Sequence, residues 1–252
     1  MSDFTLYHFL MSVCSMKARL ALEEKGVPWK SHDVDIGFKL EHLDPWYIKM
    51  NPRGVVPTLQ DGDKIITDAA RILRYVADQP GGQNLLPDSP AARVKMNEWV
   101  DKADGVNMQV LSYSRHGIPR ATELLDARIA KAAENKYRYP ELADVYEQKI
   151  KHVLDLKLGR VDEAQVKEIE EKANRHINEL EKVLQEALYI AGQTYTIADV
   201  MWTVLLARFE MIKLEELISA EQHPAVAAYY ARMKARPSFK SAKVNPEWVG
   251  GI

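Results

Sequence analysis

Met11-Ser12-Val13-Cys14-Ser15 joins two stretches whose apolar residues repeat with different periods. Before it, Phe4–Phe9 (FTLYHF) is rich in aromatic residues and predicts a short β-strand. After it, Val13, Met16 and Leu20 recur at a spacing of three and four residues, which predicts the buried face of a helix. The junction therefore predicts a strand that runs directly into a helix N-terminus.

The residues beyond this helix complete a βαβ unit. Gly26 and Pro28 mark the end of the helix, since glycine readily adopts the left-handed conformation at a C′ position and proline cannot continue a helix. Trp29–Ile36 predicts a second strand. Two strands joined through a helix by tight connections are expected to pair in parallel.

Two more strands and another helix are expected next. Val55–Leu59 and Lys64–Ile66 flank an Asp-Gly-Asp turn, which is typical of a β-hairpin. A helix is expected over Ala69–Asp78, and either Thr67 or Asp68 can cap it. The order β-α-β followed by β-β-α in the first third of the chain is the thioredoxin-like layout.

A linker separates this unit from the rest of the chain. Gln79–Pro90 (QPGGQNLLPDSP) collects proline, glycine and polar residues, so we expect two domains, residues 1–80 and residues 91–252. The second domain has helical periodicity throughout, with helices expected near Ala91–Ser114, Glu123–Lys136, Ala143–Leu156, Asp162–Ala187, Ile197–Leu214 and Ala225–Ala235. The fold class is therefore an α/β domain followed by an all-α domain.

Two features of the helical half stand out. Thr196-Ile197-Ala198-Asp199 is a capping box ahead of an almost wholly apolar helix, which predicts a helix at the centre of its domain. The charged stretch Arg115–Lys172 predicts a long, solvated helical excursion.

Composition excludes several classes of protein. Apolar residues make up 46% of the 252 and charged residues 28%, and the net charge is −2, so there is no basic field to attract nucleic acid or an anionic membrane. The longest apolar stretch, Val200–Ala207, is too short to span a bilayer. A single cysteine excludes an internal disulfide and favours a reducing cytoplasm. The seven histidines are scattered, so no metal is expected.

The one cysteine, Cys14, has two interpretations. It can be an inert core residue, since free cysteine is among the most buried residue types. At a helix N-terminus, with Lys17 one turn further on, its pKa would instead fall, and a fall of about two units leaves the thiol mostly ionised at neutral pH. We favour the working thiol because of its place between a strand end and a helix start. Ser12 can cap the helix and also donate a hydrogen bond to a bound thiolate.

Two other stretches are candidate binding elements. A cis Val56-Pro57 bond would leave the backbone of Val56 free to pair with a ligand, although the sequence does not settle the isomer. Asp68-Ala69 opens a helix, where a carboxylate and free N–H groups can hold a zwitterion or simply cap the helix. Three large aromatic residues lie at helical spacings and are expected in the core rather than around a substrate, namely Trp99, Tyr113 and Trp202.

Three of these stretches together resemble the cytosolic glutathione transferase family. They are Met11–Lys17, Asn51–Leu59 (NPRGVVPTL) and the Thr196–Asp199 capping box. The resemblance covers nearly the whole chain. More specifically, Val34–Phe38 (VDIGF) and Ile197–Glu210 resemble the zeta-like members that act on halogenated hydroquinones. It implies a cytoplasmic homodimer with a thioredoxin-like domain that binds glutathione and a helical domain that binds a small aromatic electrophile.

The resemblance also implies residue roles at the glutathione end. The backbone of Val56, beside a cis Pro57, would pair with the cysteinyl part of glutathione. Asp68 and Ala69 occupy the positions that hold its γ-glutamyl end. Ala69 departs from the family, which has serine there, so one hydroxyl contact is lost while the backbone N–H remains.

The implied chemistry is reductive dehalogenation. Ser12 would activate glutathione, whose thiolate displaces halide from the ring, and Cys14 would then take the glutathionyl group as a mixed disulfide that a second glutathione resolves. Three other functions stay open: isomerisation of a maleyl-type double bond, cleavage of aryl ethers or glutathionyl adducts, and a non-catalytic binding role that Ala69 keeps possible.

Overall fold

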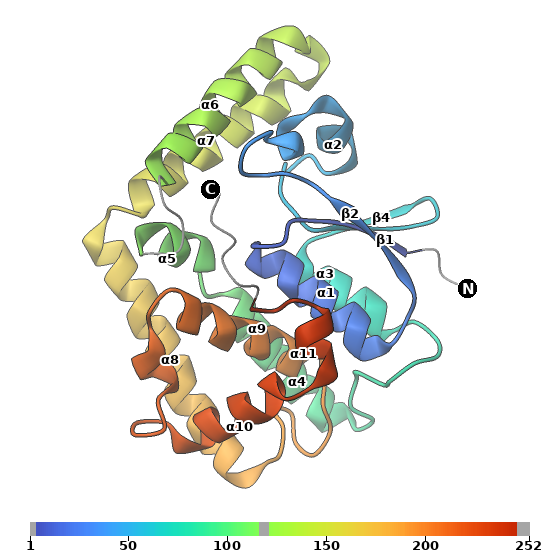
Figure 1. Cartoon of the computed structure of the whole chain (residues 1–252), viewed down its shortest axis with the longest axis vertical. Coiled ribbons are helices and arrows are strands. Elements are labelled where there is room, and N and C mark those ends of the chain that lie inside the picture. Colours follow the sequence, from blue (N-terminus) through green and yellow to red (C-terminus); the bar gives the residue numbers. More distant parts are fainter. Residues whose placement is uncertain (1–3, 116–120, 246–252) are drawn as a thin grey trace.

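The computed structural model describes residues 4–115 and 121–245. The chain ends that were assigned to the two domains, residues 1–3 and 246–252, lie outside it. Within the described residues, a small sheet with its helices comes first and a helical region follows (Figure 1).

The N-terminal region contains a mixed four-stranded sheet in the order β2-β1-β3-β4. Its strands are β1 (Phe4–His8), β2 (Trp29–Asp33), β3 (Thr58–Asp61) and β4 (Lys64–Thr67). β1 pairs with β2 in parallel and with β3 antiparallel, and β4 completes the hairpin. This confirms the thioredoxin-like layout. The expected strand Val55–Leu59 was wrong at its start, because Pro57 has no N–H to donate and pairing begins at Thr58.

Helices α1 (Val13–Lys25) and α3 (Ala69–Ala77) pack together on the side of the sheet that faces the helical region (Figure 1). α1 begins and ends as expected, with Ser12 as N-cap and Gly26 in the left-handed conformation at the C-cap. A short helix, α2 (Pro45–Met50), and the 3₁₀ turn η1 (Glu41–Leu43) lie in the β2–β3 connection, where no helix had been expected.

The first helix predicted for the helical region is in fact two separate helices. The expected helix Ala91–Ser114 is two helices, α4 (Pro90–Asp104) and α5 (Met108–Ser114), and the chain breaks at Gly105. Asn107 caps the second helix, its side chain accepting a hydrogen bond from the Val110 N–H at 3.2 Å. This break turns α5 toward the sheet domain.

A helical hairpin, α6 (Ala121–Arg138) and α7 (Ala143–Gly159), projects beside the α2 region (Figure 1). The prediction of a solvated excursion over Arg115–Lys172 was wrong for this part. Asn135 Nδ2 and Tyr146 Oη both donate to the Leu43 carbonyl, at 2.8 and 2.9 Å, and both side chains are buried. The hairpin therefore packs on the N-terminal region.

The remaining helices surround a buried central one, α9 (Ile197–Met211), in which only the residues after Phe209 leave the core. Its capping box forms as expected, with Asp199 accepting from the N–H of Thr196 at 2.8 Å. Trp202 and Trp99 pack edge to face in the same core, as expected. The other elements are η2 (Pro140–Leu142), α8 (Glu163–Glu186), η3 (Glu215–Ile218), α10 (Pro224–Lys234) and α11 (Pro237–Ser241).

Candidate active site

A pocket of about 510 Å³ lies where the two regions meet. The N-terminal region lines it with the Ser12–Cys14 corner, the Arg53–Pro57 loop and the start of α3. The helical region lines it from α5, from both helices of the α6–α7 hairpin and from α9. All six residues singled out from the sequence line this one pocket, namely Ser12, Cys14, Val56, Pro57, Asp68 and Ala69.

Ser12 and Cys14 stand at the open tip of α1. Ser12 has extended backbone angles, and its Oγ accepts a hydrogen bond from the Ser15 N–H at 3.3 Å. That bond uses a lone pair of the hydroxyl and leaves its proton free to donate. The N–H groups of Val13 and Cys14 make no hydrogen bond within the described residues. The corner therefore offers a hydroxyl donor and free amides next to one thiol.

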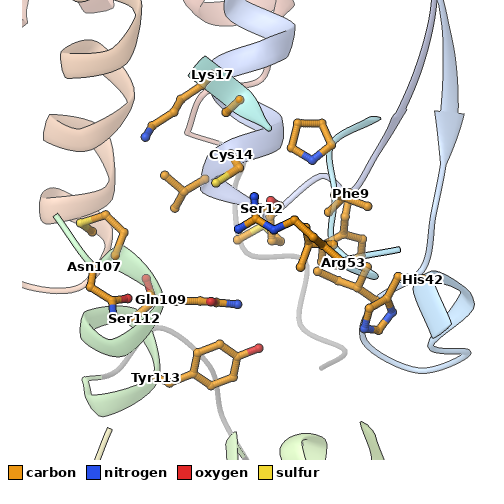
Figure 2. Close-up of a pocket in the computed structure, with 18 of the residues that line it drawn as sticks. Phe9, Ser12, Cys14, Lys17, His42, Arg53, Asn107, Gln109, Ser112 and Tyr113 are labelled. Atoms are coloured by element: carbon orange, nitrogen blue, oxygen red, sulfur yellow. The ribbon is translucent and has the colours of Figure 1, made fainter. Parts of the chain in front are cut away.

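The Cys14 thiol is exposed to the pocket, and Figure 2 shows its sulfur close to Ser12 at the mouth of α1. Enclosure by the pocket walls raises the pKa of the Cys14 thiol above its ordinary value, against attraction from Lys17. This corrects the expectation that the free site depresses that pKa: desolvation outweighs the nearby cations. Thiolate formation in this pocket thus depends on what else enters it.

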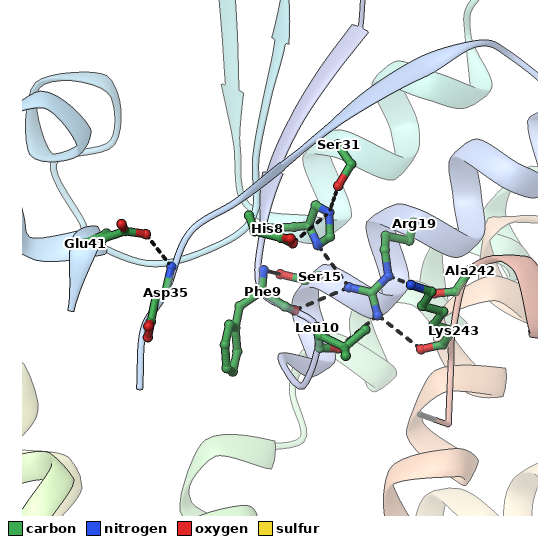
Figure 3. A network of polar contacts seen from close by, with 11 residues as sticks. His8, Phe9, Leu10, Ser15, Arg19, Ser31, Asp35, Glu41, Ala242 and Lys243 are labelled. Atoms are coloured by element: carbon green, nitrogen blue, oxygen red, sulfur yellow. Dashed lines mark hydrogen bonds and ion pairs between the residues drawn. The ribbon is translucent and has the colours of Figure 1, made fainter. Parts of the chain in front are cut away.

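Two arginines hold the loop that leads into this corner. Arg19 of α1 donates from Nη2 to the Leu10 carbonyl at 2.9 Å and to the Lys243 carbonyl at 3.1 Å (Figure 3). Arg208 of α9 donates from Nη2 to the Met11 carbonyl. Burial lowers the pKa of Arg208 to about 10, against attraction to Cys14 and Tyr113, so it stays cationic at neutral pH.

The Val56-Pro57 peptide is cis. The loop around it is fixed by Val55, whose carbonyl accepts from Tyr47 Oη at 2.8 Å and from Asn51 Nδ2 at 2.7 Å. Neither backbone polar group of Val56 has a hydrogen-bond partner among the described residues. An extended peptide can therefore pair with Val56 at the pocket wall.

Asp68 caps α3 as one of the two expected candidates, accepting from the Arg71 N–H at 3.2 Å. Its other oxygen lies 3.6 Å from Nη1 of Arg53. Ala69 is the first residue of the helix and lines the same wall. A carboxylate, a guanidinium and a helix N-terminus are thus together, which suits a ligand end that carries both an ammonium and a carboxylate.

The residues at the opposite end of the pocket were not predicted from the sequence. Tyr113, expected in the core, is buried but lines the pocket, and its hydroxyl accepts from Nη1 of Arg128 at 2.6 Å. Lys149 and His152 come from α7. Arg208 had a signal that could have revealed it, since it is the one charged residue between Asp199 and Glu210 in an otherwise buried apolar helix.

The described residues contain neither a metal-binding cluster of side chains nor a membrane-spanning helix. No group of three or more histidine, cysteine, aspartate or glutamate side chains in residues 4–115 and 121–245 could hold a metal ion. No helix in those ranges has the length and apolar character needed to cross a bilayer.

Comparison with known proteins gives matches over the whole length. The glutathione S-transferase N-terminal domain model matches residues 11–79, and the glutathione S-transferase C-terminal domain model matches residues 163–232. Tetrachloro-P-hydroquinone reductive dehalogenase of Sphingobium chlorophenolicum is 42% identical over 100% of both chains. Glutathione S-transferase TCHQD of Arabidopsis thaliana is 30% identical, covering 93% of this chain and 87% of its own length.

Solved structures share the fold. The theta class glutathione S-transferase of Xanthomonas axonopodis pv. citri with glutathione bound superposes with a TM-score of 0.67 at 22% identity, covering 96% of this chain and 97% of its own. The β-etherase LigF of Sphingobium sp. strain SYK-6 superposes with a TM-score of 0.72 at 24% identity, covering 95% of this chain and 98% of its own.

Proposed function

The chain belongs to the glutathione S-transferase family, and from that premise we propose that it is a glutathione-dependent enzyme that reductively removes halide from an aromatic such as a halogenated hydroquinone. The relative that is 42% identical over the full length is named as a reductive dehalogenase of tetrachloro-P-hydroquinone. The observation that carries the proposal is the pairing of a serine hydroxyl and the chain's one thiol at the open tip of α1, facing the pocket.

Glutathione would lie along the wall built by the N-terminal region. Its cysteinyl amide pairs with the backbone of Val56, which has no partner among the described residues, next to Pro57. Its γ-glutamyl ammonium meets Asp68, and its γ-glutamyl carboxylate meets Arg53 and the N–H of Ala69. This placement brings its thiol to Ser12, whose free proton stabilises the thiolate. Residues 1–80 then form the glutathione domain and residues 91–252 supply the walls around the electrophile.

The reaction has three balanced steps. Glutathione thiolate replaces halide on the ring, which forms a carbon–sulfur bond and releases the halide ion. The Cys14 thiolate attacks the sulfur of that adduct, the carbon–sulfur bond breaks, the ring carbon takes a proton, and a Cys14–glutathione disulfide remains. A second glutathione thiolate attacks this disulfide and releases oxidised glutathione and the Cys14 thiolate. One halide thus leaves for every two glutathiones oxidised to one disulfide.

Positive groups support the second step. Burial raises the pKa of the Cys14 thiol even though Lys17 and Arg53 attract its thiolate, so these side chains and Arg208 reduce the cost of ionisation without removing it. Each of these side chains lines the pocket. The helix N-terminus of α1 adds a further favourable potential at the sulfur.

Stoichiometry tests the proposal against its alternatives. With tetrachlorohydroquinone as substrate, we expect one oxidised glutathione for each halide released, and Cys14→Ser should accumulate the glutathionyl adduct of the ring while release of the reduced product stops. Isomerisation of a double bond would consume no glutathione. Ether cleavage without thiol oxidation would yield no oxidised glutathione. A Cys14→Ser enzyme that forms the reduced product at the wild-type rate would refute the proposal.

The homodimer that the resemblance implies stays a prediction. Sedimentation at micromolar concentration measures it directly, and a species of twice the 28.7 kDa chain mass is the expected result.

A further inference from the structure

The α6–α7 hairpin lies outside both family matches, which cover residues 11–79 and 163–232. It nevertheless lines the pocket with Leu124 and Arg128 from α6 and with Lys149 and His152 from α7. This end of the pocket is therefore built by residues that neither family model covers.

Arg128 is the central residue of this end. It is 5% exposed, and its Nη2 donates to the Ile36 carbonyl at 2.9 Å while its Nη1 donates to Tyr113 Oη at 2.6 Å. Because the phenol oxygen of Tyr113 accepts that bond, its own proton is left to donate, and no described residue accepts it. Figure 2 shows the Tyr113 hydroxyl turned toward the space between α5 and His42.

Several buried polar atoms here have no partner among the described residues. They are Nε of Arg128, Nδ1 of His42 and Oγ of Ser112, all on residues that line the pocket. A buried donor or acceptor without a partner is costly, so a hydrogen-bond partner for these atoms is favoured.

Charge at this end is unbalanced. Burial, then Arg128 and Arg53, lowers the pKa of Lys149 to about 7, and no carboxylate contributes to that shift. Burial, then Arg128, Lys149 and Lys131, lowers the pKa of His42 well below its ordinary value. The charged groups that face His152 are Lys149, Arg53 and Arg128 with one acid, Asp155. With the pKa values of Lys149, His42 and His152 lowered, the guanidinium of Arg128 is the main positive charge beside Tyr113, and it favours an anion there.

The pocket is also lined by apolar side chains, among them Phe9, Ile36, Val55, Met108 and Leu124. An aromatic ring against these side chains would place a ring oxygen near Tyr113 and Arg128, while a ring carbon faces the Ser12–Cys14 corner.

We propose that Tyr113 and Arg128 form an oxyanion site that binds the ionised hydroxyl group of a phenolic substrate, so that this enzyme selects phenolates over neutral aromatics. This proposal rests on the proposed function, because it takes the pocket to be the site that binds the electrophile. Tyr113 donates to the phenolate oxygen, and Arg128, whose Nη1 donates to Tyr113 Oη, polarises that donor and adds a positive charge beside it. α5, through Tyr113, and the hairpin, through Arg128, thus together determine which electrophile is accepted.

Equilibrium binding without glutathione tests this, because no thiol step then takes part. The probes are a dichloronitrophenol that is fully ionised at neutral pH and its neutral methyl ether, titrated into the full-length protein by calorimetry. The phenolate should bind at least ~10-fold more tightly than the ether, as a hydrogen bond to a charged group implies. Tyr113→Phe and Arg128→Gln should each remove most of that preference.

Matched control variants show whether a loss of phenolate preference is specific to Tyr113 and Arg128. Tyr137→Phe and Arg138→Gln change exposed residues of the same hairpin and should leave the preference intact. If Arg128→Gln lowers the unfolding temperature, Tyr113→Phe decides alone, since it removes only an oxygen. Equal binding of phenolate and ether, or an unchanged preference in Tyr113→Phe, would overturn the proposal. A Cys14 that never forms a disulfide would refute the proposed function and leave this result standing.

Discussion

Arg208 Nη2 donates a hydrogen bond to the Met11 carbonyl, one residue before the Ser12 cap of α1. A buried helix of the C-terminal region thereby fixes the loop that leads to the thiol, and its guanidinium lies close enough to attract a Cys14 thiolate. The position of the reactive corner therefore depends on both halves of the chain.

Removing this guanidinium should make Cys14 harder to ionise. In Arg208→Gln we expect the thiol pKa to rise by about 1 unit, because a nearby cation favours the charged form. The rate of iodoacetamide alkylation against pH measures it, and with one cysteine in the chain every event reports on Cys14. Arg208→Lys keeps the charge and should shift the profile less; an identical profile in Arg208→Gln would contradict the account.

For glutathione binding, the negative charge of Asp68 should matter more than its role as the N-cap of α3. Asn caps a helix as well as Asp does, so Asp68→Asn keeps the bond to the Arg71 N–H and loses only the negative charge beside Arg53. Glutathione affinity, measured by calorimetry, should fall about 10-fold. Asp78→Asn, at the other end of α3, is the control. Unchanged affinity in Asp68→Asn would place the γ-glutamyl end elsewhere.

Lys149 should make stability depend on pH. Its folded-state pKa is about 7 against 10.5 in the unfolded chain, so the unfolded state binds more protons between these values and Lys149 destabilises the fold most below pH 7. That cost fades as pH rises toward 10. The wild type should therefore gain at least ~2 kcal/mol of unfolding free energy relative to Lys149→Met between pH 7 and pH 10. Urea unfolding measures it, with exposed Lys151→Met as control; no pH-dependent difference would refute it.

Two adjacent linker glycines should respond differently to alanine. Both have positive φ, but a Cβ on Gly82 would lie 1.9 Å from the Lys25 carbonyl oxygen, whereas one on Gly81 would meet nothing within 4 Å. Gly81→Ala should cost about 1 kcal/mol of unfolding free energy and Gly82→Ala at least ~3 kcal/mol. Thermal unfolding compares them, and equal costs would mean that the linker does not pack on the end of α1 as described.

Local signals in the sequence predicted the sheet domain well. The Ser12 cap and Gly26 end of α1 depend on near neighbours, and the structure places both as expected. The α6–α7 hairpin was misjudged because charged residues usually mark solvent, while Lys149 uses its donors on the backbone carbonyls of Arg53 and Gly54, over ninety positions away. Tyr113 was assigned to the core, since only the break at Gly105 turns its helix into the pocket. The raised pKa of Cys14 likewise comes from enclosure by walls that no local pattern reveals.

The proposed reaction depends most on one step, in which Cys14 forms a mixed disulfide with glutathione during turnover. Intact-protein mass spectrometry of enzyme quenched during reaction with glutathione and tetrachlorohydroquinone tests it most directly. We predict a fraction of chains that carry one glutathionyl group on Cys14, removed by dithiothreitol and absent when substrate is omitted. Chains that remain unmodified throughout while the reduced product steadily forms would contradict it.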